Sequence, residues 1–187
     1  MRLTLRLLTA TGFVLCATLC LYVNAAPADR CQSARAHDKH VGTEITNPRV
    51  TNALSAAVEA SGFQHDVIIC EIYMPNLNAT VGRSGKYYYI GITRSVLEEF
   101  TDAEFEAVLG HEMAHIVLGH RDPGFELTNR RTARFEEAAD ALSAKWFDKG
   151  AMQSVLKKLR VNAKALSNEQ MKNRAIKEID ARIKALQ

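Results

Sequence analysis

The stretch that decides how this chain folds is His111-Glu112-Met113-Ala114-His115. An α-helix turns by about 100° per residue, so side chains four positions apart leave the same face of the helix. In a helix the two imidazoles would converge on one metal ion. Glu112 would stand beside that ion, where it could take a proton from a water that the metal activates. The spacing therefore predicts a helical zinc site of the kind that hydrolyses peptide bonds.

The flanking sequence favours a buried helix over the alternative, two ordinary helix histidines on either side of a surface glutamate. Buried histidine and glutamate side chains are costly unless they are paired or bound to metal. Thr101 followed by Glu104 is a capping box that predicts the start of the helix, and Gly119 predicts its end. A turn is expected at 122–124. The apolar flanking residues are Phe105, Val108, Leu109, Met113, Ile116, Val117 and Leu118.

A catalytic zinc usually has three protein ligands and one open position, so a third ligand is needed. His120 lies nine residues after His111, about 180° around a continuous helix. It also misses the spacing of the three-histidine class, which would place a histidine at Arg121. His120 is therefore expected to end the helix, where a cationic side chain suits the helix dipole, and not to bind the metal.

Glu136 is the better candidate for the third ligand. It falls in a second expected helix, 135–148, with Gly150 as the stop signal. Asp140 lies four residues later on the same face, where it could accept a hydrogen bond from a ligand histidine. Ala139 is small and would let the two helices approach closely. The alternative for Glu136 and Asp140 is an ordinary acidic helix face.

Residues 110–120 (GHEMAHIVLGH), followed by Glu136-x-x-Ala139-Asp140, resemble the zinc endopeptidases related to HtpX and to the CAAX prenyl proteases. The similarity runs from about residue 47 to 182 and is closest in character to small secreted or periplasmic bacterial members. It implies one zinc ion per chain and a zincin-like fold. The implied roles are zinc ligands for His111, His115 and Glu136, general base for Glu112, and a supporting role for Asp140.

One departure from the family concerns Arg174. Members often carry a Thr-His-Pro turn with an arginine five residues after the proline. Here the matching stretch is Ser167-Asn168-Glu169, with Arg174 at the arginine position. The resemblance implies that Arg174 orients the substrate or stabilises the oxyanion. The histidine of the turn is missing.

The N-terminus predicts export. Arg2 and Arg6 precede an uncharged apolar run, 7–23, and small residues suitable for cleavage follow before Ala26 or Pro27. This is the pattern of a secretory signal peptide spanning 1–25, so we expect a periplasmic or secreted protein. The alternative is an uncleaved segment that anchors the chain in the inner membrane through 7–23 and keeps it close to the bilayer.

Removal of 1–25 leaves Cys31 and Cys70 of the four cysteines. Two cysteines in an exported chain predict one disulfide. Zinc binding by this pair is less favoured, since the chain has no C-x-x-C motif. The signal segment carries two of the positive charges and no negative one, so the formal net charge of +3 falls to +1. That balance gives no reason to expect nucleic acid as a partner.

The remaining chain is long enough for one domain with a sizeable core. Residues 26–46 are polar and are expected to form an extended arm before the metallopeptidase domain, 47–187. The expected elements are a helix at 48–61, strands at 67–73 and 87–92 on either side of a turn at 83–86, and helices at 151–166 and 168–186. The last helix shows an apolar stripe that predicts core packing. The predicted fold class is α+β, a helical bundle that carries the HExxH helix, with a small antiparallel sheet.

The expected function is hydrolysis of unfolded or misfolded proteins in the bacterial envelope by a zinc metalloendopeptidase. The strand at 87–92 is expected to be an edge strand that pairs with the extended polypeptide substrate, with Gly91 allowing close approach; a plain sheet strand is the alternative. Two other functions stay open. One is a zinc-binding chaperone or assembly factor with little proteolysis, and the other is a zinc hydrolase of non-peptide amides.

Overall fold

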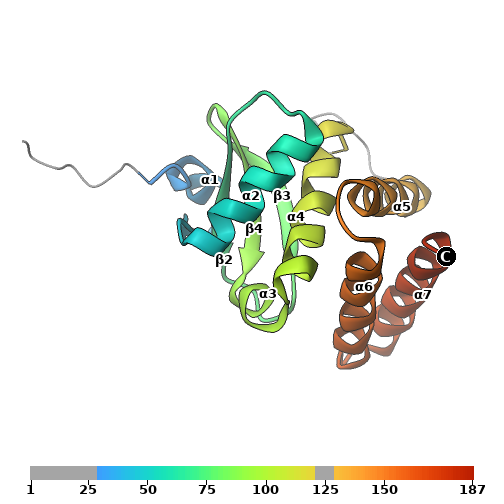
Figure 1. Ribbon diagram of the computed structural model, residues 1–187. Helices are drawn as coiled ribbons and strands as arrows, with labels where there is room; N and C mark the ends of the chain where they lie inside the picture. Colours follow the sequence, from blue (N-terminus) through green and yellow to red (C-terminus); the bar gives the residue numbers. More distant parts are fainter. Residues whose placement is uncertain (1–28, 121–128) are drawn as a thin grey trace, which may run out of the picture.

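The computed structural model describes residues 29–120 and 129–187 of the chain (Figure 1). The expected signal peptide, 1–25, and the expected turn at 122–124 lie outside these residues. The described elements, in chain order, are α1 Gln32–His37, β1 Val41–Glu44, α2 Pro48–Ser61, β2 Val67–Ile72, β3 Ala79–Ser84, β4 Tyr87–Thr93, α3 Arg94–Glu99, α4 Asp102–Val117, α5 Asn129–Trp146, α6 Lys149–Lys164 and α7 Glu169–Ala185.

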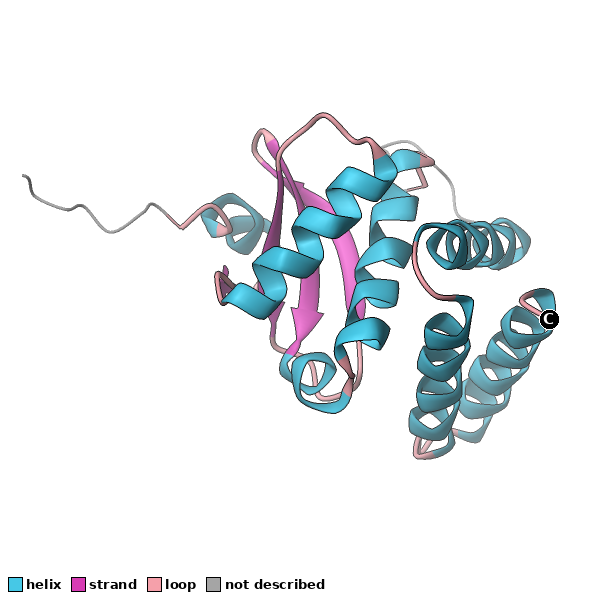
Figure 2. Ribbon diagram, in the orientation of Figure 1, coloured by secondary structure: helices cyan, strands magenta, loops and turns pink. Residues whose placement is uncertain are grey.

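The α+β fold class is confirmed, with one four-stranded sheet in the described residues (Figure 2). The strand order is β1-β2-β4-β3, and β2 pairs with β4 in parallel while the other pairs are antiparallel. The expected antiparallel sheet is therefore wrong. The reason is that the sequence pattern predicts no strand at 79–84, where β3 forms. An additional strand reverses the chain once more, so β4 runs in the same direction as β2.

This order also corrects the expectation that the strand at 87–92 is an edge strand. Strand β4 lies between β2 and β3 and is paired on both sides, so it has no free edge for a substrate. Gly91 serves packing within the sheet, because a Cβ there would lie 2.7 Å from Ile72 Cγ2 and 3.2 Å from Thr80 Cγ2. The outer strand on this side of the sheet is β3.

The two faces of the sheet are covered by different parts of the chain. On β2, Ile69 packs into the main core with α2 and α4, whereas Ile68 and Cys70 face the opposite side. Side chains alternate along a strand, so a strand covered on both faces is apolar throughout. Figure 1 shows α2 and α4 side by side over the main face, in agreement with their extensive contacts.

Residues 29–46 do not form the expected extended arm. They form α1 and β1, and β1 adds to the sheet beside β2. The predicted disulfide between Cys31 and Cys70 is present and joins the start of α1 to β2. Both cysteines are fully buried with Ala34 and Val41 in a small second core. This part of the chain therefore belongs to the folded unit.

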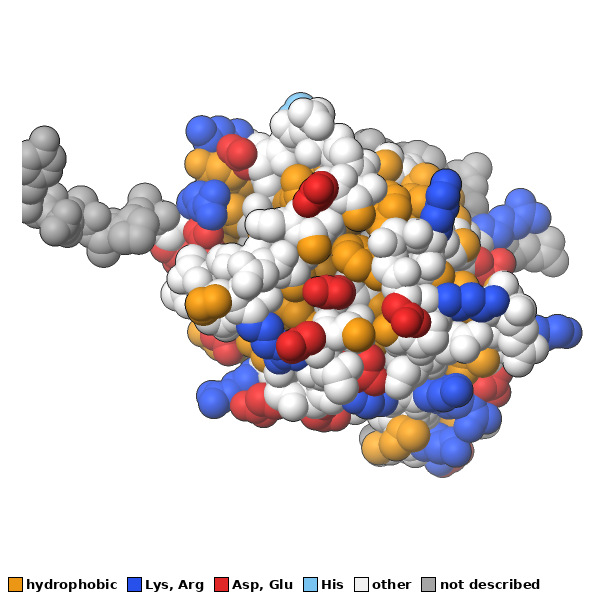
Figure 3. Space-filling view, viewed as in Figure 1, with side chains coloured by type: hydrophobic (Ala, Val, Ile, Leu, Met, Phe, Trp, Pro, Cys, Tyr) orange, Lys and Arg blue, Asp and Glu red, His pale blue; other side chains and the backbone are white. Residues whose placement is uncertain are grey.

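Helices α5, α6 and α7 lie beyond α4 and form the helical part of the molecule (Figure 1). The expected stop at Gly150 is wrong: α5 ends at Trp146, Asp148 caps α6, and Gly150 lies in the first turn of α6. The predicted stripe on α7 does pack into the main core, through Ile176, Ile179, Ile183 and Leu186. Lysine and arginine side chains gather over α6 and α7 in the space-filling view of Figure 3.

Glu104 ties the start of α4 to α6. Its carboxylate accepts hydrogen bonds from Lys158 Nζ and Ser154 Oγ, each at 2.7 Å. Burial would raise the pKa of Glu104, but these hydrogen bonds outweigh it and lower the pKa to about 2. The ion pair therefore persists at neutral pH and holds α6 at a fixed position relative to the helix that carries the HExxH motif.

Candidate metal centre

Helix α4 presents the motif inside the molecule, as its apolar flanks predict. Both halves of the capping box form: Thr101 Oγ1 accepts from the Glu104 amide at 3.3 Å, and the Thr101 amide donates to Glu104 Oε2 at 2.8 Å. His111, Glu112 and His115 are all buried. The hydrogen bond from the amide of His120 to the carbonyl of His115 closes the end of the helix.

Helix α5 crosses α4 at close range, beside the first histidine. Ala139 is fully buried there, as expected from its size. Gly110 is equally important, because a Cβ at this position would lie 2.7 Å from the ring of Phe147 and 2.8 Å from Ser143 Oγ. Ser143 Oγ also donates to the Ala107 carbonyl at 2.7 Å. The close crossing brings the acidic face of α5 against the histidines of α4.

Three side chains meet at this crossing: His111, His115 and Glu136. The two Nε2 atoms are 3.1 Å apart, and oxygen atoms of Glu136 lie 3.3 Å from His111 Nε2 and 3.4 Å from His115 Nε2. Tetrahedral zinc with bonds of about 2.0–2.1 Å separates its ligands by about 3.3 Å. The observed separations are close to this value, so the two imidazoles and the Glu136 carboxylate could hold one metal ion.

The carboxylates set the charge of this centre. Burial alone would lower the pKa of His111, but hydrogen bonding to Asp140 and Glu136 outweighs it and raises the pKa to about 9. Burial would likewise raise the pKa of Glu136, yet its contacts with the two histidines hold it well below the ordinary value. Glu136 is thus ionised at neutral pH, as a metal ligand must be. A histidine that binds zinc must be neutral, so metal binding would be coupled to loss of a proton from His111.

Asp140 and His120 contact the rear nitrogens of the two histidines. His111 Nδ1 lies 2.8 Å from Asp140 Oδ1, in a short contact whose N–H is not well aligned with the oxygen. His115 Nδ1 lies 3.0 Å from His120 Nδ1. His120 is buried and stacks on the ring of Phe135, with ring centroids 4.0 Å apart. A partner on the rear nitrogen fixes the orientation of a ligand histidine, so His120 has a part in the site that its spacing alone did not suggest.

We expect Asp140→Asn and His120→Phe each to lower zinc affinity by about 10- to 100-fold, the usual effect of losing such a partner. Phenylalanine keeps the stacking on Phe135 and removes the ring nitrogens, so it separates orientation of His115 from packing. Competition with a chromogenic chelator measures the affinity. Unchanged affinity in His120→Phe would mean that the contact with His115 is only a packing contact.

Arg182 is a member of the site that sequence reasoning missed. It reaches in from α7 and donates to both oxygens of Asp140, at 2.6 and 2.7 Å, and its Nη1 lies 3.1 Å from Glu136 Oε2. Its side chain is only 13% exposed. The sequence does contain one indication of this role. Arg182 lies next to Ile179 and Ile183 on the apolar face of the last helix, and a cation buried on such a face requires acidic partners.

Arg174 lies apart from the three converging donors. Its side chain is 58% exposed, and its Nε donates to Glu178 Oε1 at 3.0 Å on the same helix. Arg174 lines a surface cavity between α5 and α7 that also includes Glu136 and Arg182. The predicted role of Arg174 in substrate orientation therefore stays a prediction. Arg182 lies closer to the candidate metal ligands, since its Nη1 is 3.1 Å from Glu136 Oε2.

Comparison with known proteins agrees with this geometry. Residues 44–132 match peptidase family M48. A protease HtpX homolog from Moorella thermoacetica is 36% identical to this chain over 81 residues, which are 41% of this chain and 27% of that protein. The matched region thus spans about a quarter of that relative. The family match ends before Glu136, Asp140 and Arg182. The evidence that these three residues belong to the site is therefore their contacts in the structure. The HExxH helix with its candidate metal-binding group thus occurs in a chain that is similar, over residues 44–132, to peptidase family M48.

Proposed function

We propose that this chain is a zinc-dependent endopeptidase of the bacterial cell envelope that hydrolyses unfolded or misfolded proteins. The observation that carries the proposal is the convergence of His111, His115 and Glu136. The two Nε2 atoms are 3.1 Å apart, and one oxygen of Glu136 lies 3.3 Å from His111 Nε2 while the other lies 3.4 Å from His115 Nε2. Two imidazoles and one carboxylate are the ligand set of catalytic zinc in several proteases. Zinc as the metal, and one ion per chain, are part of the proposal.

Glu112 is the proposed general base. It is buried beside His111 and lines the same cavity. When bound, zinc would polarise the scissile carbonyl and make a water molecule acidic enough to attack it. Glu112 accepts the proton from this water and then passes it to the nitrogen of the leaving amine, so the C–N bond breaks without releasing an amide anion.

The outer strand β3 supports an extended substrate. Ala79, at its start, lines a cavity with His111 and Glu112, and Val81 and Gly82 line another with His115. Strand β3 therefore runs along the side of α4 that carries the histidines. A polypeptide that adds to the open edge of a sheet is held through its backbone and can have many sequences. Folded proteins would resist, because their backbones are already paired.

The envelope location rests on the sequence and on one structural feature. The signal-like segment 1–25 favours export, and the buried disulfide between Cys31 and Cys70 suits an oxidising compartment. Within 29–120 and 129–187, no helix is both long and apolar enough to cross a membrane. The segment at 7–23 lies outside the described residues, so membrane anchoring stays the alternative to secretion.

The rival proposal is a zinc-binding chaperone or assembly factor with little proteolysis. Glu112 argues against it, because zinc that only stabilises a fold is usually closed off by four protein ligands and needs no general base. Here three donors converge, and Glu112 lies at the open side with access to a cavity. A polypeptide substrate therefore accounts for more of the site than a purely binding role does.

Metal removal tests the proposed activity. Reduced, carboxymethylated proteins and casein should be cut at many sites by the zinc-loaded protein, and their native disulfide-bonded counterparts should be resistant. Treatment with a chelator should abolish cleavage, and about one equivalent of zinc should restore it. Mass spectrometry of the products measures the cleavage. Stoichiometric zinc binding without any cleavage of unfolded chains would favour the chaperone instead.

A further inference from the structure

A cavity of about 160 Å³ opens beside the proposed catalytic residues. Its polar end is formed by His111, Glu112, Glu136 and Arg182. Apart from Asn78, its walls are apolar. They come from the loop before β3, helix α3 with its C-cap, and helices α4 and α6. The apolar wall includes Leu77, Val96, Phe100, Met152, Val155 and Leu159.

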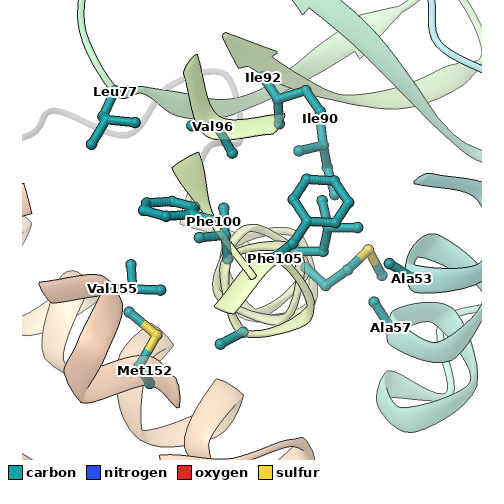
Figure 4. Packing of buried hydrophobic residues seen from close by; sticks show 14 of the residues in the cluster. Ala53, Ala57, Leu77, Ile90, Ile92, Val96, Phe100, Phe105, Met152 and Val155 are labelled. Atoms are coloured by element: carbon teal, nitrogen blue, oxygen red, sulfur yellow. The ribbon is translucent and has the colours of Figure 1, made fainter. Parts of the chain in front are cut away.

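Figure 4 looks nearly along α4 and shows which part of the main core borders this space. Ala53, Ala57, Ile90 and Phe105 pack on one side of the helix, toward α2 and the sheet. The cavity residues lie on the opposite side of α4, where α6 faces the loop before β3. The labelled members of that group are Leu77, Phe100, Met152 and Val155.

The size of the cavity selects the chemical class of its occupant. An apolar cavity of about 150 Å³ holds a benzene molecule. A space of about 160 Å³ therefore fits one leucine, methionine or phenylalanine side chain, and the larger indole has the least room to orient. A carboxylate would lose its hydration among apolar walls without gaining a partner at that depth, so acidic side chains should be rejected.

The position of Glu112 decides which substrate residue enters. Glu112 hands its proton to the amine that leaves, and this nitrogen belongs to the residue after the scissile bond. Glu112 and His111 line the cavity, whereas His115 does not. We infer that the cavity binds the side chain immediately C-terminal to the cleaved bond and selects a single large apolar residue there. This inference rests on the proposed peptidase activity.

Peptides that differ only at that residue test the inference. For the zinc-loaded protein, kcat/KM should be about 10- to 100-fold higher with leucine or phenylalanine than with alanine, which is typical of a filled apolar pocket. Tryptophan should fall below phenylalanine, and aspartate below alanine. Cleavage of all these peptides at similar rates would overturn the inference and leave the proposed peptidase activity intact.

Two variants change the cavity in opposite directions. Val155→Phe places a ring inside it and should remove the preference for leucine and phenylalanine, so that alanine becomes the better residue. Val161→Phe is the matched control, since it lies on the same helix but is 67% exposed and outside the cavity. Leu77→Ala enlarges the cavity and should raise kcat/KM for tryptophan. An unchanged preference in both cavity variants would overturn the assignment.

A binding measurement keeps the inference testable without catalysis. The methyl group of Met152 is buried in the cavity wall. Benzene should shift its NMR signal in the wild-type protein and in Val161→Phe, and should leave it unmoved in Val155→Phe. If benzene shifts the signal while no peptide is cut, the proposed activity fails and the pocket stands. If benzene has no effect on the wild type, the cavity does not bind an apolar group and the inference fails.

Discussion

Glu112→Gln should lower peptide hydrolysis by about 10²- to 10⁴-fold, the range expected for loss of a general base, while zinc stays near one per chain. Glutamine keeps the volume and the buried position of the side chain but cannot accept a proton from water. Glu112 does not belong to the group of donors that converge within 4.8 Å of one another, so the metal should remain. Casein cleavage and elemental analysis of the same sample measure both quantities.

The matched control is Glu106→Gln, the same substitution on the same helix at a residue outside the cavity. It should retain wild-type activity. If Glu112→Gln loses zinc along with activity, Glu112 is a ligand or supports one, and its assignment as the base is wrong. If Glu112→Gln stays active, another group moves the proton.

Glu136→Ala should lower zinc affinity by more than about 100-fold, because it removes a ligand, whereas loss of an outer partner costs about 10- to 100-fold. Activity should fall with zinc content. The change also removes the carboxylate that lies 3.1 Å from Arg182 Nη1, while the ion pair of Arg182 with Asp140 remains. Isothermal titration of the apoprotein with zinc measures the loss.

Glu137→Ala, the next position on α5, is the control and should bind zinc like the wild type. The distinction is geometric, since consecutive helix positions point about 100° apart and Glu137 does not belong to the converging donors. Full zinc occupancy in Glu136→Ala would show that Asp140 or another carboxylate supplies the third ligand.

The helix that carries the HExxH motif could be predicted closely because its signals are local. The capping box at Thr101 and Glu104 and the end near Gly119 lie within the helix or next to it, and α4 runs from Asp102 to Val117. The same holds for α2, where Pro48 starts the helix and Gly62 follows it with φ +65°. Hydrogen bonds of this kind join residues three to five positions apart, so they do not depend on the rest of the fold.

The sheet could not be predicted in the same way. Strand β3 has the sequence Ala-Thr-Val-Gly-Arg-Ser, which has few of the residues that favour strands. It forms because Gly82 pairs with Tyr89 and leaves room for its ring: a Cβ on Gly82 would lie 2.6 Å from that ring. This is a contact between strands. Without β3, β4 would be expected to run antiparallel to β2 and to form the edge of the sheet. With β3 present, β4 runs parallel to β2 and β3 is the outer strand.

The sequence by itself indicated the candidate donors His111, His115 and Glu136, with Asp140 beside them. His111 and His115, and likewise Glu136 and Asp140, are four residues apart, and this spacing places each pair on one face of its helix. Only the tertiary structure decided what surrounds them: His120 behind His115, Arg182 across both carboxylates, and the apolar cavity beside Glu112. Those features depend on how α4 packs with α5, α6, α7 and β3. Such packing is set by contacts between distant residues, to which no local pattern points.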